Sequence, residues 1–390
     1  MGSRLLGEML SSVSTRELPA DERRYQEKRY RRTRSLHTVL GPIEFERDYY
    51  RCPECTRIPF DEEVGILDES FSPGVRKMMG FAASQGSYIQ ASEELRMLAR
   101  LEISDHSIQR EVQKTGPKIQ KFMDALPQEP IEEAIPVMYV LTDGTGAPMR
   151  KDALEGRKGK QADGSSKTRE VKVGCVYTQH TCDEKGAPIT DKGSVSHIAN
   201  FKTAQDFGGD VLHEARRRGL AHATQKVFLG DGAKWIWEIA RVNFPDAVQI
   251  LDYYHASEHL TLLYKHLFGD VENKNSPYEK WKTWLWEGEV SLVLAEVSKF
   301  ESKAKNIESL EKEKKYFLKN AKRMKYGTYR KSGWEIGSGK VEAGCRTVVA
   351  ERMKKSGMFW SLPGAENILA FRCCVMNHSY DAFWDEIMAA

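Results

Sequence analysis

After Pro130 the chain alternates short apolar runs with polar turns, and this alternation is its clearest hydrophobic pattern. The runs are rich in Val, Ile, Leu, Phe and Tyr, a composition that predicts strands. The five predicted strands are 136–142, 171–177, 196–201, 225–230 and 248–251. Helical periodicity predicts one helix between the third and fourth strands, at 204–218, and another between the fourth and fifth, at 235–244.

Three successive strands followed by alternating helices and strands is the order of the ribonuclease-H-like α/β fold. Chemical groups in open α/β sheets gather where strands end. Asp143 follows the first predicted strand and Asp231 the fourth, and in that fold these two ends are neighbours. A late helix starts near Ser338, its candidate N-cap, and carries Glu342 in its first turns. The order therefore predicts that three carboxylates meet at one edge of the sheet.

Each of these acids also has a simpler interpretation. Asp143 and Asp231 both precede glycine, and Asp-Gly is a common turn dipeptide. Glu342 near a helix start favours the positive end of the helix dipole. The joint placement of all three is much rarer by chance, and it favours a shared site. Clustered carboxylates suit hard cations such as Mg²⁺ or Mn²⁺, and two such ions support in-line displacement at phosphorus.

A further polar segment follows the fifth predicted strand. Asp252 and His255 have a spacing that could bind zinc, with Glu258 and His259 following on the same helix. The alternative is a helix start in which Asp252 is the cap and His255 packs against the sheet. We favour the helix start. The stretch after it, 256–335, lacks a strand pattern and predicts an all-helical insertion.

The amino-terminal region has a basic segment and a hairpin pattern. Residues 23–34 hold seven Lys or Arg and two tyrosines, which suits phosphate contacts or a solvated basic helix or tail. Alternation on either side of Gly41-Pro42, at 37–40 and 43–50, predicts a β-hairpin. The hairpin runs into Cys52 and Cys55, whose spacing is half of a structural zinc site.

Helical periodicity covers residues 72–126. The capping-box spacing from Ser92 predicts one helix start, and Ser104 predicts another after a break at 101–104. Two helices across a tight turn resemble a helix-turn-helix, in which the second helix reads a DNA groove. Many helical hairpins share this pattern, so it leaves both interpretations open.

Composition fits a soluble globular protein, with 40% hydrophobic and 29% charged residues. The formal net charge of +3 does not by itself indicate nucleic acid, and 390 residues predict two or three domains. Seven scattered cysteines favour a reducing cytosol over a disulfide framework. Because no apolar run approaches 18 residues, neither a membrane span nor a membrane partner is expected.

Four sequence blocks resemble bacterial DDE-type insertion-sequence transposases of the ISKra kind, which are related to the Mutator-like and hAT-like group. The blocks are Asp143-Gly-Thr-Gly, Gly230-Asp231-Gly-Ala-Lys-Trp, Leu251-Asp252-Tyr-Tyr-His255, and Gly337-Ser-Gly-Lys-Val-Glu342-Ala-Gly-Cys-Arg346 with the trailing Ser356-Gly-Met-Phe-Trp360-Ser. The resemblance runs from about His37 to Arg372. Relatives in that family commonly carry an additional upstream Cys pair, which this chain lacks.

The resemblance implies a ribonuclease-H-like catalytic domain interrupted by helices. Its triad would be Asp143, Asp231 and Glu342, binding two Mg²⁺ or Mn²⁺ ions. Residues near this triad would be Asp252, His255, Arg346 and Trp360. The implied activity is that of a DNA transposase, which hydrolyses phosphodiesters at transposon ends and transfers the freed strand into target DNA. The expected partners are double-stranded DNA and a second copy of the chain, in the bacterial cytoplasm at the nucleoid.

Basic segments are the expected phosphate contacts, at 23–34, 150–172 and 312–325. The side chains expected to bind DNA are Arg29, Arg31, Arg32, Lys158, Lys160, Lys340 and Trp360. Cys52 and Cys55 are the candidate ligands for Zn²⁺.

Five regions are expected along the chain. They are a basic arm with a Cys-containing hairpin at 1–70, a helical DNA-binding region at 71–130, the first part of the catalytic core at 131–255, a helical insertion at 256–335, and the rest of the core at 336–390. Two alternative functions stay open: an inactive or domesticated DNA-binding protein, and a structure-specific nuclease on the same fold that performs no strand transfer.

Overall fold

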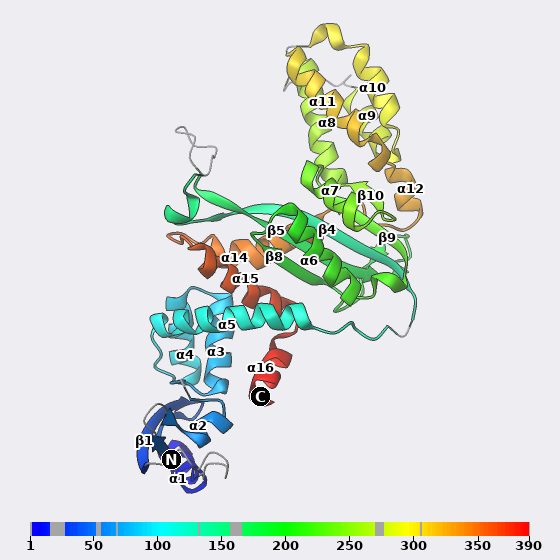
Figure 1. Cartoon of the computed structure of the whole chain (residues 1–390). Coiled ribbons are helices and arrows are strands. Elements are labelled where there is room, and N and C mark those ends of the chain that lie inside the picture. Colours follow the sequence, from blue (N-terminus) through cyan, green and yellow to red (C-terminus); the bar gives the residue numbers. More distant parts are fainter. Residues whose placement is uncertain are drawn as a thin grey trace. The chain divides into compact units, whose positions relative to one another are not determined.

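The computed structural model divides the chain into two compact units (Figure 1), Met1–Asp124 with Pro363–Ala390, and Ala125–Leu362. The residues that it describes are 2–15, 28–51, 56–67, 69–131, 133–156, 166–269, 277–304 and 306–389.

The first unit begins with a helix on a small antiparallel sheet. Helix α1 (Gly2–Val13) packs on strand β2 (Gly41–Arg51), which lies between β1 (Lys28–Thr38) and the short β3 (Thr56–Arg57). With α2 (Pro59–Glu63), the sheet buries a core of Leu36, Ile43, Phe45, Phe60 and Ile66. The hairpin prediction is confirmed, but its first strand begins nine residues before the predicted start. Residues 28–34 of the basic segment are therefore part of a strand and not of a helix or tail, and residues 23–27 lie outside the described residues.

Five helices complete the first unit: α3 (Pro73–Gln85), α4 (Tyr88–Ala99), α5 (Asp105–Ala125), α15 (Leu362–Met376) and α16 (Tyr380–Ala389). The capping-box prediction at Ser92 is wrong, because Ser87 caps α4 by accepting the Gln90 N–H. The Arg372 guanidinium on α15 donates to the Ser84 carbonyl at 3.0 Å. Because of such contacts, residues 363–390 belong to the same unit as the amino-terminal helices. The predicted region 336–390 is therefore divided between the two units.

The second unit is built on a five-stranded mixed sheet. Its strands are β4 (Ile135–Pro148), β5 (Thr168–Gln179), β8 (Ser196–Asn200), β9 (Ala223–Gly230) and β10 (Val248–Leu251). Their order is β10-β9-β4-β5-β8; the neighbours β4, β5 and β8 pair antiparallel, whereas β9 and β10 run parallel to β4. All five predicted strands are found, and the unit is a mixed α/β domain.

Helices cover both faces of this sheet. On one face, a side chain at Gly174 of β5 would come within 2.9 Å of Val211, which lies on α6 (Ala204–Arg217); α7 (Lys234–Asn243) packs beside α6. The adjacent Val173 points to the opposite face because successive strand residues alternate. There it lies close to Gly344, at the end of α13 (Gly339–Gly344). Helix α13 continues as a π-helical turn, η6 (Cys345–Ala350), and α14 (Glu351–Met353).

The predicted insertion is a set of helices that begins three residues early. It comprises α8 (Tyr253–Phe268), α9 (Tyr278–Glu287), α10 (Val290–Ser298), α11 (Ile307–Asn320) and α12 (Tyr326–Lys331). Buried Trp281, Val293 and Phe317 form part of its core. The remaining short elements are η2 (Asp152–Leu154), β6 (Thr181–Cys182), β7 (Pro188–Ile189), η3 (Leu220–His222), η4 (Glu301–Lys303) and η5 (Ala321–Arg323). Within the described ranges, we find no helix that combines the length and the apolarity of a membrane span.

Candidate active site at the ends of three parallel strands

The register of the parallel strands brings three aspartates to one edge of the sheet. Leu141 of β4 pairs with Leu229 of β9, and Gly230 of β9 pairs with Leu251 of β10. Continuing this register by two residues places Asp143 beside Asp231, and continuing it by one places Asp231 beside Asp252. All three lie toward the carboxyl ends of these strands, where polar groups of α/β sheets collect.

Asp143 lies inside a strand. Strand β4 continues to Pro148, and Asp143 pairs with Val173 of β5, so the prediction that Asp143 ends the strand in a turn is wrong. Its side chain therefore points to the face covered by α13 and η6. One carboxylate oxygen, Oδ1, accepts the Gly144 N–H at 2.6 Å, and Oδ2 accepts the Cys345 thiol at 3.4 Å. The strand and the π-helical turn together fix the orientation of this carboxylate.

Asp231 directly follows β9, as predicted. Its Oδ1 accepts the Ala233 N–H at 2.9 Å, and its carbonyl accepts the Tyr316 hydroxyl at 3.3 Å. Gly232 has a φ of 103°, a left-handed conformation that favours glycine. The Asp-Gly pair thus forms a sharp bend and also presents a carboxylate at the strand end.

Glu342 lies in the first turns of α13 and is exposed. Ser338 occupies the N-cap position, but its side chain makes no capping hydrogen bond. Its hydroxyl instead donates to Glu342 Oε1 at 2.5 Å, so Ser338 holds the glutamate. The π-helical turn that follows brings Cys345 to Asp143, and turns of this rare kind occur often at functional sites.

The three acids interact electrostatically. Burial raises the pKa of the Asp143 carboxyl, and the negative charges of Asp231 and Glu342 raise it further. The Gly144 N–H and the Cys345 thiol oppose this change by stabilising the carboxylate. Among the residues that the structure describes, no Lys, Arg or His forms an ion pair with Asp143, Asp231 or Glu342. The site therefore concentrates negative charge that the protein itself does not neutralise.

The donor atoms at this sheet edge are carboxylate oxygens, the type of ligand that hard cations such as Mg²⁺ prefer. No group of three His, Cys, Asp or Glu in the described ranges is placed to hold a single metal ion. Mg²⁺ in enzymes is commonly held by one or two carboxylates and keeps several waters, and a two-ion site shares its carboxylates between the ions. Burial and the Asp143 charge raise the pKa of Cys345, so its sulfur stays a thiol and is a poor metal ligand.

Asp252 is a structural link in this site. It is only 1% exposed, and it caps α8 by accepting the His255 N–H at 2.6 Å. Its other oxygen accepts the Ser338 N–H, so Asp252 ties the start of α8 to the segment that leads into α13. The prediction that Asp252 caps a helix is confirmed, whereas the His255 side chain is 39% exposed and contacts the His259 ring on the same helix.

The neighbouring histidines both contact other side chains of the fold. His255 lies 3.6 Å from the exposed Glu258 carboxylate. His259 bonds to Glu313 at 2.5 Å and stacks on Tyr316 at a ring separation of 3.6 Å. These contacts account for both imidazole rings as packed helix residues.

The predicted DNA-binding residues fall into different environments. Arg346 is exposed one helical turn beyond Glu342. Arg31 and Arg32 are exposed on β1, where the Arg32 guanidinium lies 4.1 Å from the centre of the Tyr49 ring. Arg29 also lies on β1, where it pairs with Tyr50. Outside the described residues lie Lys158, Lys160, Cys52 and Cys55.

Two of the predicted DNA contacts are engaged within the protein. Lys340 forms a 2.8 Å ion pair with Glu335 and lies 4.6 Å from the centre of the Tyr177 ring. Trp360 is 8% exposed, and its indole N–H donates to the Met353 carbonyl at 3.0 Å. Trp360 therefore packs within its unit and offers little surface to a nucleic acid.

Sequence reasoning missed Ser338 as a partner of Glu342 and Cys345 as a partner of Asp143. A signal existed for both, because Ser338 lies four residues before Glu342 and Cys345 three residues after it. Side chains at these spacings share one face of a helix. Lys354 was also missed; its ammonium donates to the Thr145 hydroxyl at 2.6 Å, on the part of β4 that follows Asp143.

Comparison with known proteins gives similarities to uncharacterised relatives. The model of an uncharacterised protein family, UPF0236, matches residues 1–163. A UPF0236 protein of Caldanaerobacter subterraneus subsp. tengcongensis is 24% identical over 357 residues, which is 88% of this chain and 67% of the relative. The name of this relative joins eleven locus designations, so the relative is encoded at many places in one genome. A UPF0236 protein of Streptococcus gallolyticus is 23% identical over 362 residues, 90% of this chain and 74% of the relative.

Among solved structures, the Drosophila P element transposase strand transfer complex is similar to this chain with a TM-score of 0.32 and 10% sequence identity. The match covers 84% of this chain and 83% of that chain.

Proposed function

We propose that this protein is a DDE transposase whose catalytic carboxylates are Asp143, Asp231 and Glu342. The observation that carries the proposal is the strand register that brings Asp143 and Asp231 to one sheet edge, where the helix that carries Glu342 continues into the turn whose Cys345 thiol donates to Asp143. The order and directions of the strands fit a ribonuclease-H-like core, in which α13 is the late helix that carries the third carboxylate. The four sequence blocks that resemble transposases of the ISKra kind contain these same residues.

The proposed chemistry is two successive displacements at phosphorus. Water attacks the scissile phosphate, the P–O3′ bond breaks, and the element strand is left with a 3′-hydroxyl. That hydroxyl then attacks a target phosphodiester, where a new P–O bond forms as the target P–O3′ bond breaks. Two Mg²⁺ or Mn²⁺ ions, when bound, activate the attacking oxygen and stabilise the leaving oxygen. Asp143 and Asp231 would hold them from the sheet edge and Glu342 from α13, while Ser338 and Cys345 orient the carboxylates.

The repetition of a relative in one genome supports a mobile element. A gene that copies or moves itself accumulates at several loci, and the name of the first Caldanaerobacter relative joins eleven. Two further relatives from the same organism have names that join four and two loci.

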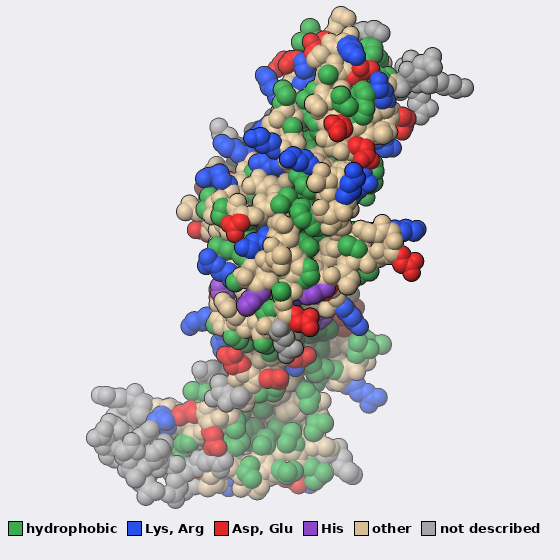
Figure 2. Space-filling model, turned by 90° about the vertical axis from the view of Figure 1, so that its right-hand side faces the viewer, with side chains coloured by type: hydrophobic (Ala, Val, Ile, Leu, Met, Phe, Trp, Pro, Cys, Tyr) green, Lys and Arg blue, Asp and Glu red, His purple; other side chains and the backbone are tan. Residues whose placement is uncertain are grey.

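The proposed partner is double-stranded DNA, at the element ends and at the target, bound by a dimer of this chain. Figure 2 shows Lys and Arg side chains gathered on one face of the second unit, at the height of α7 and α12 in Figure 1. In the catalytic unit, Arg346 is the exposed cation one turn from Glu342 and is the first choice for a phosphate contact. Arg31 and Arg32 provide a second candidate surface in the first unit. Contacts of this kind make affinity fall steeply with added salt.

The test uses labelled duplex DNA that carries the genomic sequence flanking the coding region. The full-length protein should cleave it in the presence of Mg²⁺, and Asp143→Asn, Asp231→Asn and Glu342→Gln should each lose cleavage at least about 10³-fold while still binding the duplex. Asp246→Asn is the matched control, because Asp246 is exposed and pairs with Lys226 away from the proposed triad. A triad variant that cleaves like the control would remove that residue from the triad.

Pre-cut ends separate the remaining possibilities. If the protein joins a pre-cut 3′-hydroxyl end to a target plasmid, it is a transposase. Cleavage without joining would indicate a structure-specific nuclease. Binding without either reaction would indicate a DNA-binding protein that has lost its chemistry.

A further inference from the structure

A groove of about 750 Å³ lies beside the segment that leads into the Glu342 helix. Its walls come from the β6–β7 hairpin, the start of α8, the end of α9 and residues 330–337, all within the second unit. Its aromatic lining residues are Tyr254, Trp286 and Trp334. Its cationic ones are Lys185, Arg330 and Lys331.

A flat cationic platform is already formed in this groove. The Arg330 guanidinium lies 3.9 Å from the centre of the Trp286 ring. It donates to the Trp286 carbonyl at 3.1 Å and to Glu287 Oε1 at 3.0 Å, which fixes its plane. Nucleobases stack on aromatic rings and on guanidinium planes of this kind. Because Glu287 offsets its charge, Arg330 contributes a stacking surface more than a net positive charge.

Tyr254 provides a second stacking surface. Its side chain is 67% exposed, although most large aromatic residues in the described ranges are covered. The ring lies against Gly337, where an added Cβ would come within 2.9 Å of it. The absence of a side chain at Gly337 therefore makes room for the ring at the groove wall, next to the start of α13.

The other two cations suit phosphate. Lys185 and Lys331 are exposed, and neither side chain has a hydrogen-bond or ion-pair partner within the described ranges. Glu335, the acid that lines the groove, is paired with Lys340 at 2.8 Å. The groove thus combines aromatic surfaces with unneutralised positive charge, as sites for unpaired nucleic acid do.

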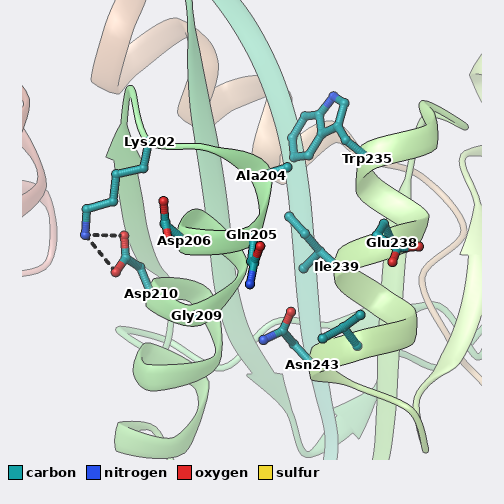
Figure 3. A pocket seen from close by; sticks show the side chains of 11 residues that line it. Lys202, Ala204, Gln205, Asp206, Gly209, Asp210, Trp235, Glu238, Ile239 and Asn243 are labelled. Carbon is teal, nitrogen blue, oxygen red and sulfur yellow. Dashed lines mark hydrogen bonds and ion pairs between the residues drawn. The ribbon is translucent and has the colours of Figure 1, made fainter.

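A hollow between α6 and α7 lacks this combination (Figure 3). Its cation, Lys202, is bonded to Asp210 at 2.8 Å, and Asp206 and Glu238 also line the hollow. Trp235 provides one aromatic wall. The excess of acids would repel a phosphate backbone, so the groove beside α13 is the better nucleotide site.

We propose that the groove formed by Tyr254, Trp286, Arg330, Lys331 and Lys185 binds a nucleotide with an unpaired base, which stacks on the aromatic and guanidinium surfaces while its phosphate meets the two lysines. The preferred source is a single-stranded stretch of the DNA that enters the active site. Glu335 and Ile336 line the groove and lie three and two residues before Ser338, the hydrogen-bond partner of Glu342, so the groove adjoins the segment that carries the third proposed triad residue. The use of this strand as a substrate rests on the proposed function, whereas nucleotide binding does not.

The experiment measures binding of the full-length protein to a labelled 20-nucleotide oligothymidylate and to a duplex of the same length, by fluorescence anisotropy without Mg²⁺. Tyr254→Ala should weaken oligothymidylate binding about tenfold, the scale of one lost base–aromatic stack, and change duplex binding less than about twofold. Tyr254→Phe keeps the ring and should bind like the wild type.

Charge variants test the phosphate contacts. Lys331→Glu should weaken binding and reduce the slope of log K against log salt by about 0.7 or more, as expected for a lost contact to a single strand. Lys282→Glu, which changes an exposed lysine of α9 outside the groove lining, is the matched control and should change neither. Normal oligothymidylate binding by Tyr254→Ala and Lys331→Glu, or equal losses on the single strand and the duplex, would overturn the proposal.

Two further measurements identify the source of the nucleotide and separate this proposal from the preceding one. Displacement of the oligonucleotide by free thymidine triphosphate at comparable concentration would assign the groove to a free nucleotide, and displacement by oligonucleotides alone would assign it to a DNA strand. Asp231→Asn should bind oligothymidylate normally. If no DNA is cleaved but the groove variants still lose binding, the transposase proposal fails while the groove assignment stands.

Discussion

Two clusters of charged side chains, one in each unit, are built in opposite ways. In the first unit, fully buried Asp61 is bonded to two arginines, Arg34 and Arg47, the second at 3.2 Å. Buried Arg76 lies between Glu69 at 3.0 Å and Glu111 at 2.9 Å. Each buried charge in these clusters has an opposite charge beside it.

In the second unit, the charges at the sheet edge have like charges beside them. Burial raises the pKa of Asp143, the negative charges of Asp231 and Glu342 raise it further, and its hydrogen-bond donors are a backbone N–H and a thiol. The difference separates charges that are neutralised within the fold from carboxylates that, under the proposed function, bind a cation. Removing one partner of a buried ion pair lowers the stability of the folded protein. For a cluster of unpaired carboxylates, binding a cation or removing one of the charges should raise that stability.

The largest expected effect is on the paired cluster. Asp61→Ala should lower the free energy of unfolding by about 3–5 kcal/mol, because it leaves two mostly buried guanidinium groups without their carboxylate. Urea denaturation followed by circular dichroism measures it. Asp124→Ala, at an exposed site on α5, is the control and should stay within about 0.5 kcal/mol of the wild type. A similar loss in both variants would show that Asp61 is not a special support.

The next effect is on the unpaired cluster. Mg²⁺ at about 100 times its dissociation constant should raise the free energy of unfolding by about 2.7 kcal/mol, because only the folded chain brings the carboxylates together. Thermal melts with and without Mg²⁺ measure this shift. It should vanish in Asp231→Asn and persist in Asp246→Asn. An undiminished shift in Asp231→Asn would place the ion elsewhere.

A smaller effect is the pH dependence of stability without metal. The folded chain raises the pKa of Asp143 above its ordinary value of 3.8, so the folded state holds this proton more tightly than the unfolded state. Asp143 therefore costs stability as pH rises from about 3.8 through its folded pKa. Asp143→Asn should be more stable than the wild type at pH 7, by on the order of 1 kcal/mol as for many single substitutions, and should lose this advantage near pH 3.5. An advantage that is equal at both pH values would exclude the ionisation of Asp143 as its cause.

The smallest effect concerns Cys345. Its thiol stabilises the Asp143 carboxylate, so Cys345→Ala should raise the pKa of Asp143 further and shift the acidic limb of the cleavage pH profile upward. A lost hydrogen bond of this kind corresponds to about 0.5–1.5 kcal/mol, a few-fold change in rate on that limb. Cys345→Ser keeps a donor and should retain the wild-type profile. Identical profiles for the alanine and serine variants would show that the thiol only fills space.

The sequence by itself predicted the strands of the second unit, the helices that follow them and the positions of Asp143, Asp231 and Glu342. Strand and helix periodicities are local properties, so they can be read from short stretches of chain. The prediction that the first strand ends at Asp143 was wrong because the residues Asp-Gly-Thr-Gly are typical of a turn. The turn does not form there, because residues 168–173 of β5 pair with residues 143–148 and extend the ladder.

Only the tertiary structure decided which polar side chains are left for a ligand. Lys340 and Trp360 are of residue types that often contact DNA. In the fold, however, Lys340 pairs with Glu335 and lies over the Tyr177 ring, and Trp360 donates to the Met353 carbonyl. Tyr254, which the sequence did not single out, stays exposed because Gly337 leaves room for its ring. Availability of a side chain depends on neighbours that are distant in sequence. The periodicity of the sequence carries no information about those neighbours. They determine whether a charged side chain is paired within the fold or stays accessible.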